Sequence, residues 1–193
     1  MRIIAGSAKG RKLVSPEGDT ARPTSDRARE ALFSSLESEF NNMEGIRFLD
    51  LFAGSGAVTA EAISRGASSC TLVDSDRLAM EIARKNVEIA RSSLQSVKAV
   101  EVNFIDDDAE TFVKRKSNPF DVIFIDPPYA YPDLELTEMV THLLENGYIA
   151  PSTLVVIERA NRASEFPWPD SMREVKVRRY GNAAIFYGEV AKG

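Results

Sequence analysis

The residues best suited to chemistry stand at the end of one apolar run. Val122 to Ile125 lacks polar alternation, which is typical of a strand buried on both faces of a parallel sheet. An acid, two prolines and a tyrosine follow directly, Asp126-Pro127-Pro128-Tyr129. Proline cannot extend a sheet ladder, so the chain must leave the sheet there. Open α/β sheets bind ligands beyond the carboxyl ends of their strands, which makes this turn a candidate site. An ordinary strand-ending turn is the alternative.

A second candidate site is the glycine-containing stretch Asp50-Leu51-Phe52-Ala53-Gly54-Ser55-Gly56. It joins a predicted strand to a predicted helix, where glycines let a ligand approach the backbone closely. The third glycine of a dinucleotide fingerprint is missing, because Thr59 holds that position, and this disfavours a nicotinamide or flavin enzyme. Asp74, 20 residues beyond Gly54, ends the next predicted strand, where a carboxylate can accept both hydroxyls of a ribose.

The elements that must position these residues alternate between strand and helix. Strands are predicted at 46–52, 70–74, 97–104, 120–125, 153–158, 174–180 and 183–190. Helices are predicted at 54–65, 76–91, 109–114 and 134–144. Such a series predicts an α/β fold: a doubly wound, mostly parallel seven-stranded sheet with an antiparallel edge strand.

The first 29 residues are basic, although the chain as a whole has a net charge of -5. They hold seven Lys or Arg against three Asp or Glu, a net of +4. Strands at 2–5 and 11–14 are predicted to form a hairpin with a flexible basic tip at 6–10, and a helix capped by Thr24 or Ser25 should run to about Phe40. Such an end can guide a polyanion to one face, while a solvated basic tail is the alternative.

Composition sets the outer limits. With 193 residues, 44% hydrophobic and 27% charged, the chain is predicted to be a soluble globular protein, and we expect a monomer. One cysteine, Cys70, excludes a disulfide framework and favours a reducing compartment. The only histidine, His142, has no second His or Cys nearby in sequence to complete a metal site, so no metal is predicted. Without a long apolar run or a secretory signal, a cytoplasmic location away from membranes is expected.

Both motifs resemble those of a known enzyme class. Asp50 to Gly56 resembles the S-adenosylmethionine loop of Rossmann-like class I methyltransferases. Asp126 to Tyr129 resembles the signature of the members that methylate exocyclic amino groups of nucleobases. The N-terminal stretches narrow the resemblance to the bacterial guanine-N2 methyltransferases of 16S ribosomal RNA: Met1–Gly6, Lys9–Arg11, Arg22–Arg27 and Arg29–Phe33. The resemblance covers almost the whole chain, and Asp74 stands where that family usually has Glu.

The resemblance implies S-adenosylmethionine as cofactor, and 16S ribosomal RNA or the assembling small ribosomal subunit as partner. Residues 1–40 would be an RNA-binding extension with a β-hairpin, and 41–193 the methyltransferase domain. The implied cofactor residues are Asp50, Phe52, Gly54, Ser55, Gly56, Asp74, Asp108, Arg22 and Thr24. The implied RNA-binding residues are Arg2, Lys9, Arg11 and Lys12.

Individual roles follow for the cofactor residues. Asp50 would lie near the amino group of the methionine part, and Asp74 would bind the ribose. Asp108 is the candidate for the adenine amine, with Asp106 and Asp107 as alternatives. Arg22 and Thr24 would reach the methionine carboxylate, although a turn and a helix cap explain them equally.

The catalytic residues implied are Asp126, Pro127, Pro128 and Tyr129. The exocyclic amine of guanine is a poor nucleophile because its lone pair is delocalised into the ring. Asp126 and the carbonyl of Pro127 can each accept one of its hydrogens, and Tyr129 offers a face for an extruded base, a stacking contact worth roughly 1–3 kcal/mol. Tyr131 is a weaker candidate for stacking. The alternatives are adenine-N6 methylation of DNA or RNA, a NAD-dependent oxidoreductase, and a non-catalytic RNA-binding protein.

Overall fold

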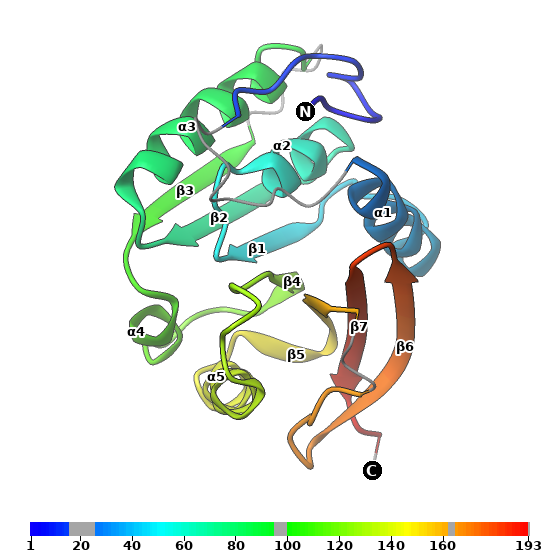
Figure 1. Ribbon diagram of the computed structural model, residues 1–193, viewed down its shortest axis with the longest axis vertical. Helices are drawn as coiled ribbons and strands as arrows, with labels where there is room; N and C mark the ends of the chain where they lie inside the picture. The colour runs from blue at the N-terminus through cyan, green and yellow to red at the C-terminus, as the bar shows by residue number, and fades with distance from the viewer. Residues whose placement is uncertain (16–25, 95–99, 162–164, 193) are drawn as a thin grey trace.

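The computed structural model describes residues 1–15, 26–94, 100–161 and 165–192. Its strands form one sheet in the order β3-β2-β1-β4-β5-β7-β6 (Figure 1). The strands are β1 (Arg47–Leu51), β2 (Ser69–Asp74), β3 (Glu101–Asp106), β4 (Phe120–Ile125), β5 (Ile149–Ala160), β6 (Met172–Tyr180) and β7 (Ala183–Val190). The helices are α1 (Asp26–Phe40), α2 (Ala57–Ser64), α3 (Arg77–Arg91), α4 (Ala109–Val113) and α5 (Asp133–Glu145).

The predicted α/β fold with a mostly parallel seven-stranded sheet is confirmed, with one refinement. β7 runs antiparallel to β5 and β6 and lies between them, so the edge strand is β6. β6 and β7 form a hairpin around Gly181, whose φ of 55° suits a tight turn. β7 is buried along most of its length, whereas β6 is largely exposed and carries four Lys or Arg residues. The apolar strand therefore takes the inner position, and the charged strand forms the edge.

Helices cover both faces of the sheet (Figure 1). α1, α2 and α3 contribute to one hydrophobic cluster, and α4 and α5 contribute to the other. β4 shows why its sequence lacks polar alternation: Val122 and Phe124 point into the first cluster, Ile123 and Ile125 into the second. A strand buried on both faces needs apolar residues at every position.

The N-terminal segment, residues 1–15, contains the predicted hairpin only as a short bridge between Arg2 and Lys12. Its turn, predicted from sequence to be flexible, is hydrogen-bonded to α2. Ser7 donates its backbone N–H to the Ser64 carbonyl of α2 at 2.7 Å. A Cβ on Gly6 would stand 1.9 Å from that carbonyl oxygen, so only glycine allows this close approach.

A buried carboxylate ties the N-terminal segment to the body of the protein. Glu61 of α2 accepts the backbone N–H groups of Ile4 at 2.7 Å and Ala5 at 2.9 Å. It also accepts Nε of Arg65 at 2.8 Å. Arg29 of α1, fully buried, donates to the Arg2 carbonyl at 2.7 Å. The segment, α1 and α2 therefore share one network, and the domain boundary at residue 40 stays a prediction.

None of the helices in the described part of the chain is long and apolar enough to cross a membrane.

Candidate active site

The glycine loop, residues 52–56, follows β1 and leads into α2. Phe52, Gly54 and Gly56 all have left-handed φ values, of 62°, 53° and 67°. A Cβ on Gly56 would stand 2.8 Å from that of Ala83, so this glycine lets α2 pack on α3. A Cβ on Gly54 would find its nearest described neighbour, the Phe52 carbonyl oxygen, only at 4.0 Å. The two glycines therefore serve different ends: Gly56 serves packing, and Gly54 leaves open surface for a ligand.

Asp74, at the end of β2, holds this loop through its carboxylate. Oδ2 accepts the Gly54 N–H at 2.7 Å, and Oδ1 accepts the Asp76 N–H at 2.8 Å. Each carboxylate oxygen has a second acceptor site. Asp74 can thus orient the loop and still accept hydrogen bonds from a bound ribose.

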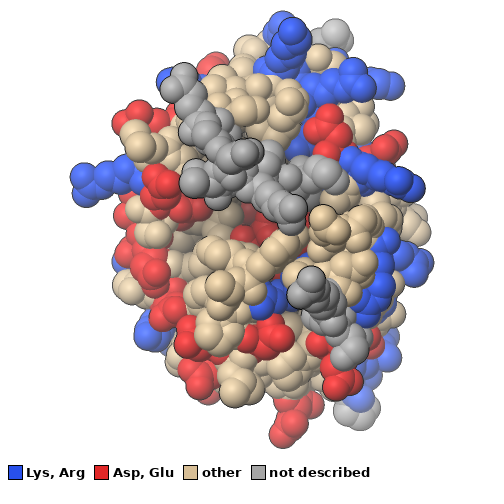
Figure 2. Space-filling model, viewed as in Figure 1, with Lys and Arg blue, Asp and Glu red and all other residues tan. Residues whose placement is uncertain are grey.

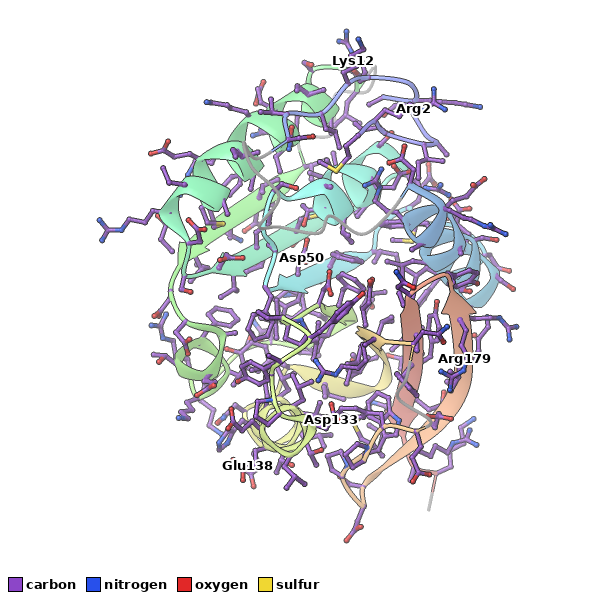
Figure 3. All side chains as sticks on the ribbon, in the orientation of Figure 1. Arg2, Lys12, Asp50, Asp133, Glu138 and Arg179 are labelled. Atoms are coloured by element: carbon purple, nitrogen blue, oxygen red, sulfur yellow. The ribbon has the colours of Figure 1, made fainter. Side chains whose placement is uncertain are left out.

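Asp50 lies on β1, in the middle of the molecule (Figure 3), and is buried. Its pKa is raised to about 7, mainly because burial disfavours the charged form. The nearby Asp126 and Asp74 carboxylates also raise the pKa, whereas the hydrogen bond that the Thr59 hydroxyl donates to Oδ2 at 2.6 Å lowers it. The carboxylates of Asp74, which ends β2, and of Asp126, which follows β4, therefore both act electrostatically on Asp50 of β1. Thr59, noted in the sequence only as the place of a missing glycine, is the residue that anchors Asp50.

The turn that carries the predicted catalytic residues, 126–131 and called the catalytic turn below, begins directly beside the glycine loop. Ile125 pairs with Leu51 across the parallel strands β4 and β1. The Asp126 N–H then donates to the Leu51 carbonyl at 3.3 Å. Pro127 is buried, while Pro128 and Tyr129 are exposed. The turn thus presents an acid and an aromatic ring next to the glycine loop.

Tyr131 joins the catalytic turn to the glycine loop. Its ring meets Phe52 edge to face, with centroids 5.4 Å apart. Its hydroxyl donates to the Glu110 carboxylate of α4, and burial followed by this hydrogen bond raises the pKa of Tyr131. Tyr129, by contrast, has 40% of its surface exposed. This arrangement supports packing as the role of Tyr131 and leaves Tyr129 as the candidate for stacking.

Arg159, near the end of β5, was not singled out in the sequence. It is buried and pairs with Asp133 of α5, Nε to Oδ1, at 2.8 Å. Its guanidinium also donates to the Tyr131 carbonyl at 2.5 Å and to the Pro128 and Tyr129 carbonyls at 3.4 Å each. One side chain therefore holds three carbonyls of the catalytic turn. The available signal was the charged pair Glu158 and Arg159 directly after the apolar run 154–157 of the same strand.

Asn86, in the middle of α3, was also missed. Its side chain is buried and pairs with Val14 in both directions, accepting the N–H at 2.7 Å and donating to the carbonyl at 3.0 Å. The same Nδ2 donates to the Ser55 carbonyl of the glycine loop at 2.8 Å. Asn86 thus connects the N-terminal segment with the candidate cofactor loop. A single asparagine within an amphipathic helix gives no sequence signal for this role.

The three acids considered for the adenine amine all have other partners. Asp108 caps α4, since its Oδ1 accepts the N–H groups of Glu110 at 2.9 Å and Thr111 at 3.2 Å. Asp106 pairs with Arg84 at 3.3 Å, and Asp107 pairs with Arg115. The role of Asp108 stays a prediction. Arg22 and Thr24 lie outside the described residues.

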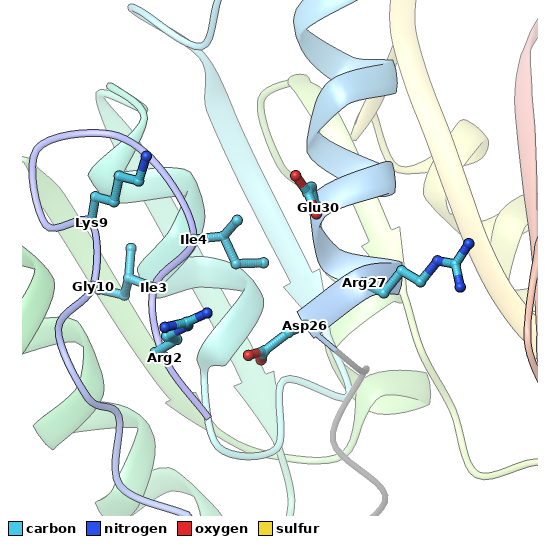
Figure 4. A pocket seen from close by; sticks show the side chains of 8 residues that line it. All are labelled: Arg2, Ile3, Ile4, Lys9, Gly10, Asp26, Arg27 and Glu30. Atoms are coloured by element: carbon cyan, nitrogen blue, oxygen red, sulfur yellow. The ribbon is translucent and has the colours of Figure 1, made fainter.

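All four predicted RNA-binding side chains are exposed: Arg2, Lys9, Arg11 and Lys12. Arg2 and Lys12 lie at the upper end of the molecule (Figure 3). Arg2 and Lys9 line one side of a cavity of about 400 Å³, and Asp26, Arg27 and Glu30 of α1 line the other (Figure 4). Among the described residues, no predicted catalytic or cofactor residue borders this cavity.

Comparison with known proteins gives the family. A family model described as "Conserved hypothetical protein 95" matches residues 1–189. The chain belongs to that family. The "Ribosomal RNA small subunit methyltransferase D" of Escherichia coli strain K12 is 37% identical over 158 residues, which are 82% of this chain and 74% of that protein. The protein of the same name from Haemophilus influenzae is 34% identical over 160 residues, covering 82% and 78%.

Solved structures agree with this membership. A putative methyltransferase from Escherichia coli superimposes with a TM-score of 0.81 at 30% identity, over 100% of this chain and 99% of that one. The magnesium protoporphyrin IX methyltransferase of Synechocystis, solved with bound S-adenosylmethionine, shares the fold with a TM-score of 0.62 at 12% identity, over 86% of this chain and 79% of that one. The expected class I methyltransferase family and its Rossmann-like fold are confirmed, and the expected cofactor is the molecule bound in the second of these structures.

Proposed function

We propose that this member of the family transfers the methyl group of S-adenosylmethionine to the exocyclic N2 amine of a guanine in 16S ribosomal RNA. One observation carries the proposal: Asp126, the predicted acceptor of amine hydrogens, begins its turn beside the glycine loop, bonded through its N–H to the Leu51 carbonyl at 3.3 Å. A methyl donor on the loop and an amine at the turn would then be neighbours. The names of the relatives support ribosomal RNA as substrate.

The donor side is formed by the glycine loop with Asp50 and Asp74. The open surface at Gly54 would receive the methionine part, and the Asp50 carboxylate would face its amino group. Asp74 would accept the ribose hydroxyls while it holds the Gly54 N–H. Asp108 would bind the adenine amine.

The acceptor side is formed by the catalytic turn. Asp126 and the Pro127 carbonyl would accept the two amine hydrogens, so that the nitrogen lone pair leaves conjugation and points at the methyl group. S-adenosylmethionine would supply the methyl group and leave as S-adenosylhomocysteine, and the proton that the methylated amine loses would pass to the Asp126 carboxylate or to water. Tyr129 would stack on a base turned out of the RNA.

RNA affinity would come from the exposed cations of the N-terminal segment, because phosphate contacts supply most of it. The substrate would be 16S ribosomal RNA, free or in the assembling small subunit. An enzyme with this substrate acts in the cytoplasm. The monomeric state stays a prediction.

The test is methyl transfer from labelled S-adenosylmethionine to 16S ribosomal RNA, and to small subunits, that lack the modification. Digestion to nucleosides should give N2-methylguanosine. Methyladenosine, or labelling of DNA alone, would support adenine-N6 methylation instead. Stabilisation by NAD but not by S-adenosylmethionine, measured by thermal shift, would overturn the proposal.

A further inference from the structure

The edge strand β6 is strongly basic, in a chain whose net charge is -5. Within Met172–Tyr180 it holds one acid, Glu174, and four cations: Arg173, Lys176, Arg178 and Arg179. Arg173, Arg178 and Arg179 are exposed, and Lys176 is half-buried with Nζ 5.4 Å from the ring centroid of Tyr187. Figure 2 shows Lys and Arg side chains along the right flank of the molecule, the side on which Figure 1 has α1 and β6.

The register of the sheet aligns Arg178 with the catalytic acid. Ile125 pairs with Ile157, Ile157 with Phe186, and Phe186 with Val177. The next row lies one residue closer to the carboxyl ends of β4 and β5. In it Glu158 pairs with Ile185, and Ile185 pairs with Arg178. Asp126, which directly follows Ile125, stands at the β4 end of this row. Three strand spacings separate Asp126 from Arg178, which is about 14 Å along the sheet.

The two ends of β6 differ in how their cations are engaged. Arg173, at the amino end, forms an ion pair with Glu189 of β7. In the middle of the strand Lys176, and toward its carboxyl end Arg178, form no ion pair with an acid in the described part of the chain. Arg179, next to Arg178, donates to the backbone carbonyl of Asn161 at 2.9 Å. Arg178 is therefore an exposed charge, level with the catalytic turn and available to an outside anion.

We propose that the carboxyl end of β6, with Arg178 as its main contact, binds the phosphate backbone of the RNA substrate. This inference rests on the proposed function. An enzyme that turns out a base must hold the strand that carries it, and cations on phosphates supply that hold. The N-terminal segment would bind RNA phosphates on one side of the catalytic turn, and β6 would bind them on the other. α1 lies between these two elements (Figure 1).

A different explanation of the charge is protection of the edge strand. Lys and Arg on an edge strand prevent pairing with the edge of another molecule. That explanation gives no preference to either end of β6, whereas a phosphate contact requires the end beside the catalytic turn. Arg173 and Arg178 are five residues apart, roughly 16 Å along the strand, which is twice the Debye length of about 8 Å at physiological salt.

The experiment compares Arg178→Gln with the matched control Arg173→Gln, which removes the same charge from the other end of the strand. Affinity for a 16S ribosomal RNA fragment is measured from 0.05 to 0.5 M salt. Loss of one phosphate contact lowers the slope of log affinity against log salt by about 0.7, so Arg178→Gln should bind about fourfold more weakly at 0.15 M and about eightfold more weakly at 0.05 M. Arg178→Lys should keep most of the affinity and the wild-type slope.

Arg173→Gln should match the wild type in affinity and slope. Equal losses in both variants, or none in Arg178→Gln, would overturn the inference, as would self-association of Arg178→Gln at unchanged RNA affinity. Thermal-shift titration with S-adenosylhomocysteine checks that both variants keep the fold. If the wild type methylates the RNA and Arg178→Gln binds it equally well, only the β6 contact fails. If the wild type neither binds nor methylates the RNA, the proposed function fails with it.

Discussion

The glycine loop and the catalytic turn lie side by side but are held in different ways. The glycine loop is fixed by three contacts with neighbouring elements: Gly56 packs on Ala83, the Asp74 carboxylate accepts the Gly54 N–H, and the Asn86 side chain donates to the Ser55 carbonyl. The catalytic turn stands more exposed, and Arg159 holds three of its carbonyls. Separate residues thus hold each part of the predicted donor side, whereas a single cation holds three carbonyls of the predicted acceptor side.

The largest effect is expected at the acid that begins the catalytic turn. Asp126→Ala removes an acceptor for the amine hydrogens, and the loss of one such preorganised group lowers turnover by roughly 10²- to 10³-fold. Affinity for S-adenosylhomocysteine should change little, because the loop contacts remain. Single-turnover methyl transfer and calorimetric titration measure the two effects. Activity near that of the wild type would remove Asp126 from the mechanism.

A smaller effect, confined to the donor side, is expected from pH. The pKa of Asp50 is about 7, and only its charged form attracts the amino group of the cofactor. Affinity for S-adenosylhomocysteine should therefore fall as the pH falls, by roughly thirtyfold between pH 8 and pH 5.5 if the protonated form does not bind. Asp50→Asn should bind weakly at both values. Wild-type affinity that is independent of pH would contradict the role of Asp50.

The stability of the fold should depend on pH in the opposite direction to cofactor affinity, so its measurement provides a control. Between about pH 4 and 7, the folded protein keeps a proton on Asp50 that the unfolded chain releases, since the pKa is raised from 3.8 to about 7. The contribution of Asp50 to stability therefore falls as the pH rises through this window and is constant above it. Asp50→Asn lacks the dependence, so its melting temperature at pH 8 should equal or exceed that of the wild type. A lower value would show that Asn cannot replace Asp50 structurally.

A smaller effect is expected for Arg159→Met, which tests how far the catalytic turn depends on one cation. The carbonyls of Pro128, Tyr129 and Tyr131 would lose their shared donor, so we expect methyl transfer to slow by roughly tenfold while cofactor affinity stays unchanged. Asp133→Asn is the matched control, because it weakens the ion pair and leaves the carbonyl contacts in place. Equal losses in the two variants would assign the effect to the ion pair.

The smallest effect is expected at Asn86, which connects the N-terminal segment with the glycine loop. Asn86→Ala leaves the Val14 and Ser55 groups without their partner, which should lower the free energy of unfolding by about 1–3 kcal/mol. Affinity for the cofactor and for RNA should each fall a few-fold. If denaturant unfolding shows the loss and neither affinity changes, Asn86 has a packing role only.

Sequence alone located both halves of the candidate site. Proline restricts the backbone and glycine frees it whatever the surrounding fold, so the effects of Pro127, Pro128, Gly54 and Gly56 could be inferred from the sequence itself. Apolar runs such as Val122–Ile125 likewise predicted the strands and the fold class. The roles of the individual site residues stay predictions.

Only the tertiary structure decided which side chains support the site and how the sheet is ordered. Asn86 contacts Val14, 72 positions earlier, and Arg159 contacts Pro128, 31 positions earlier. The alignment of Arg178 with Asp126 depends on β7 lying between β5 and β6. Such contacts depend on where packing brings distant segments together, whereas a glycine loop or a Pro-Pro turn is encoded by adjacent residues. The sequence therefore determined which chemistry the chain can present, and the fold determined what holds it in place.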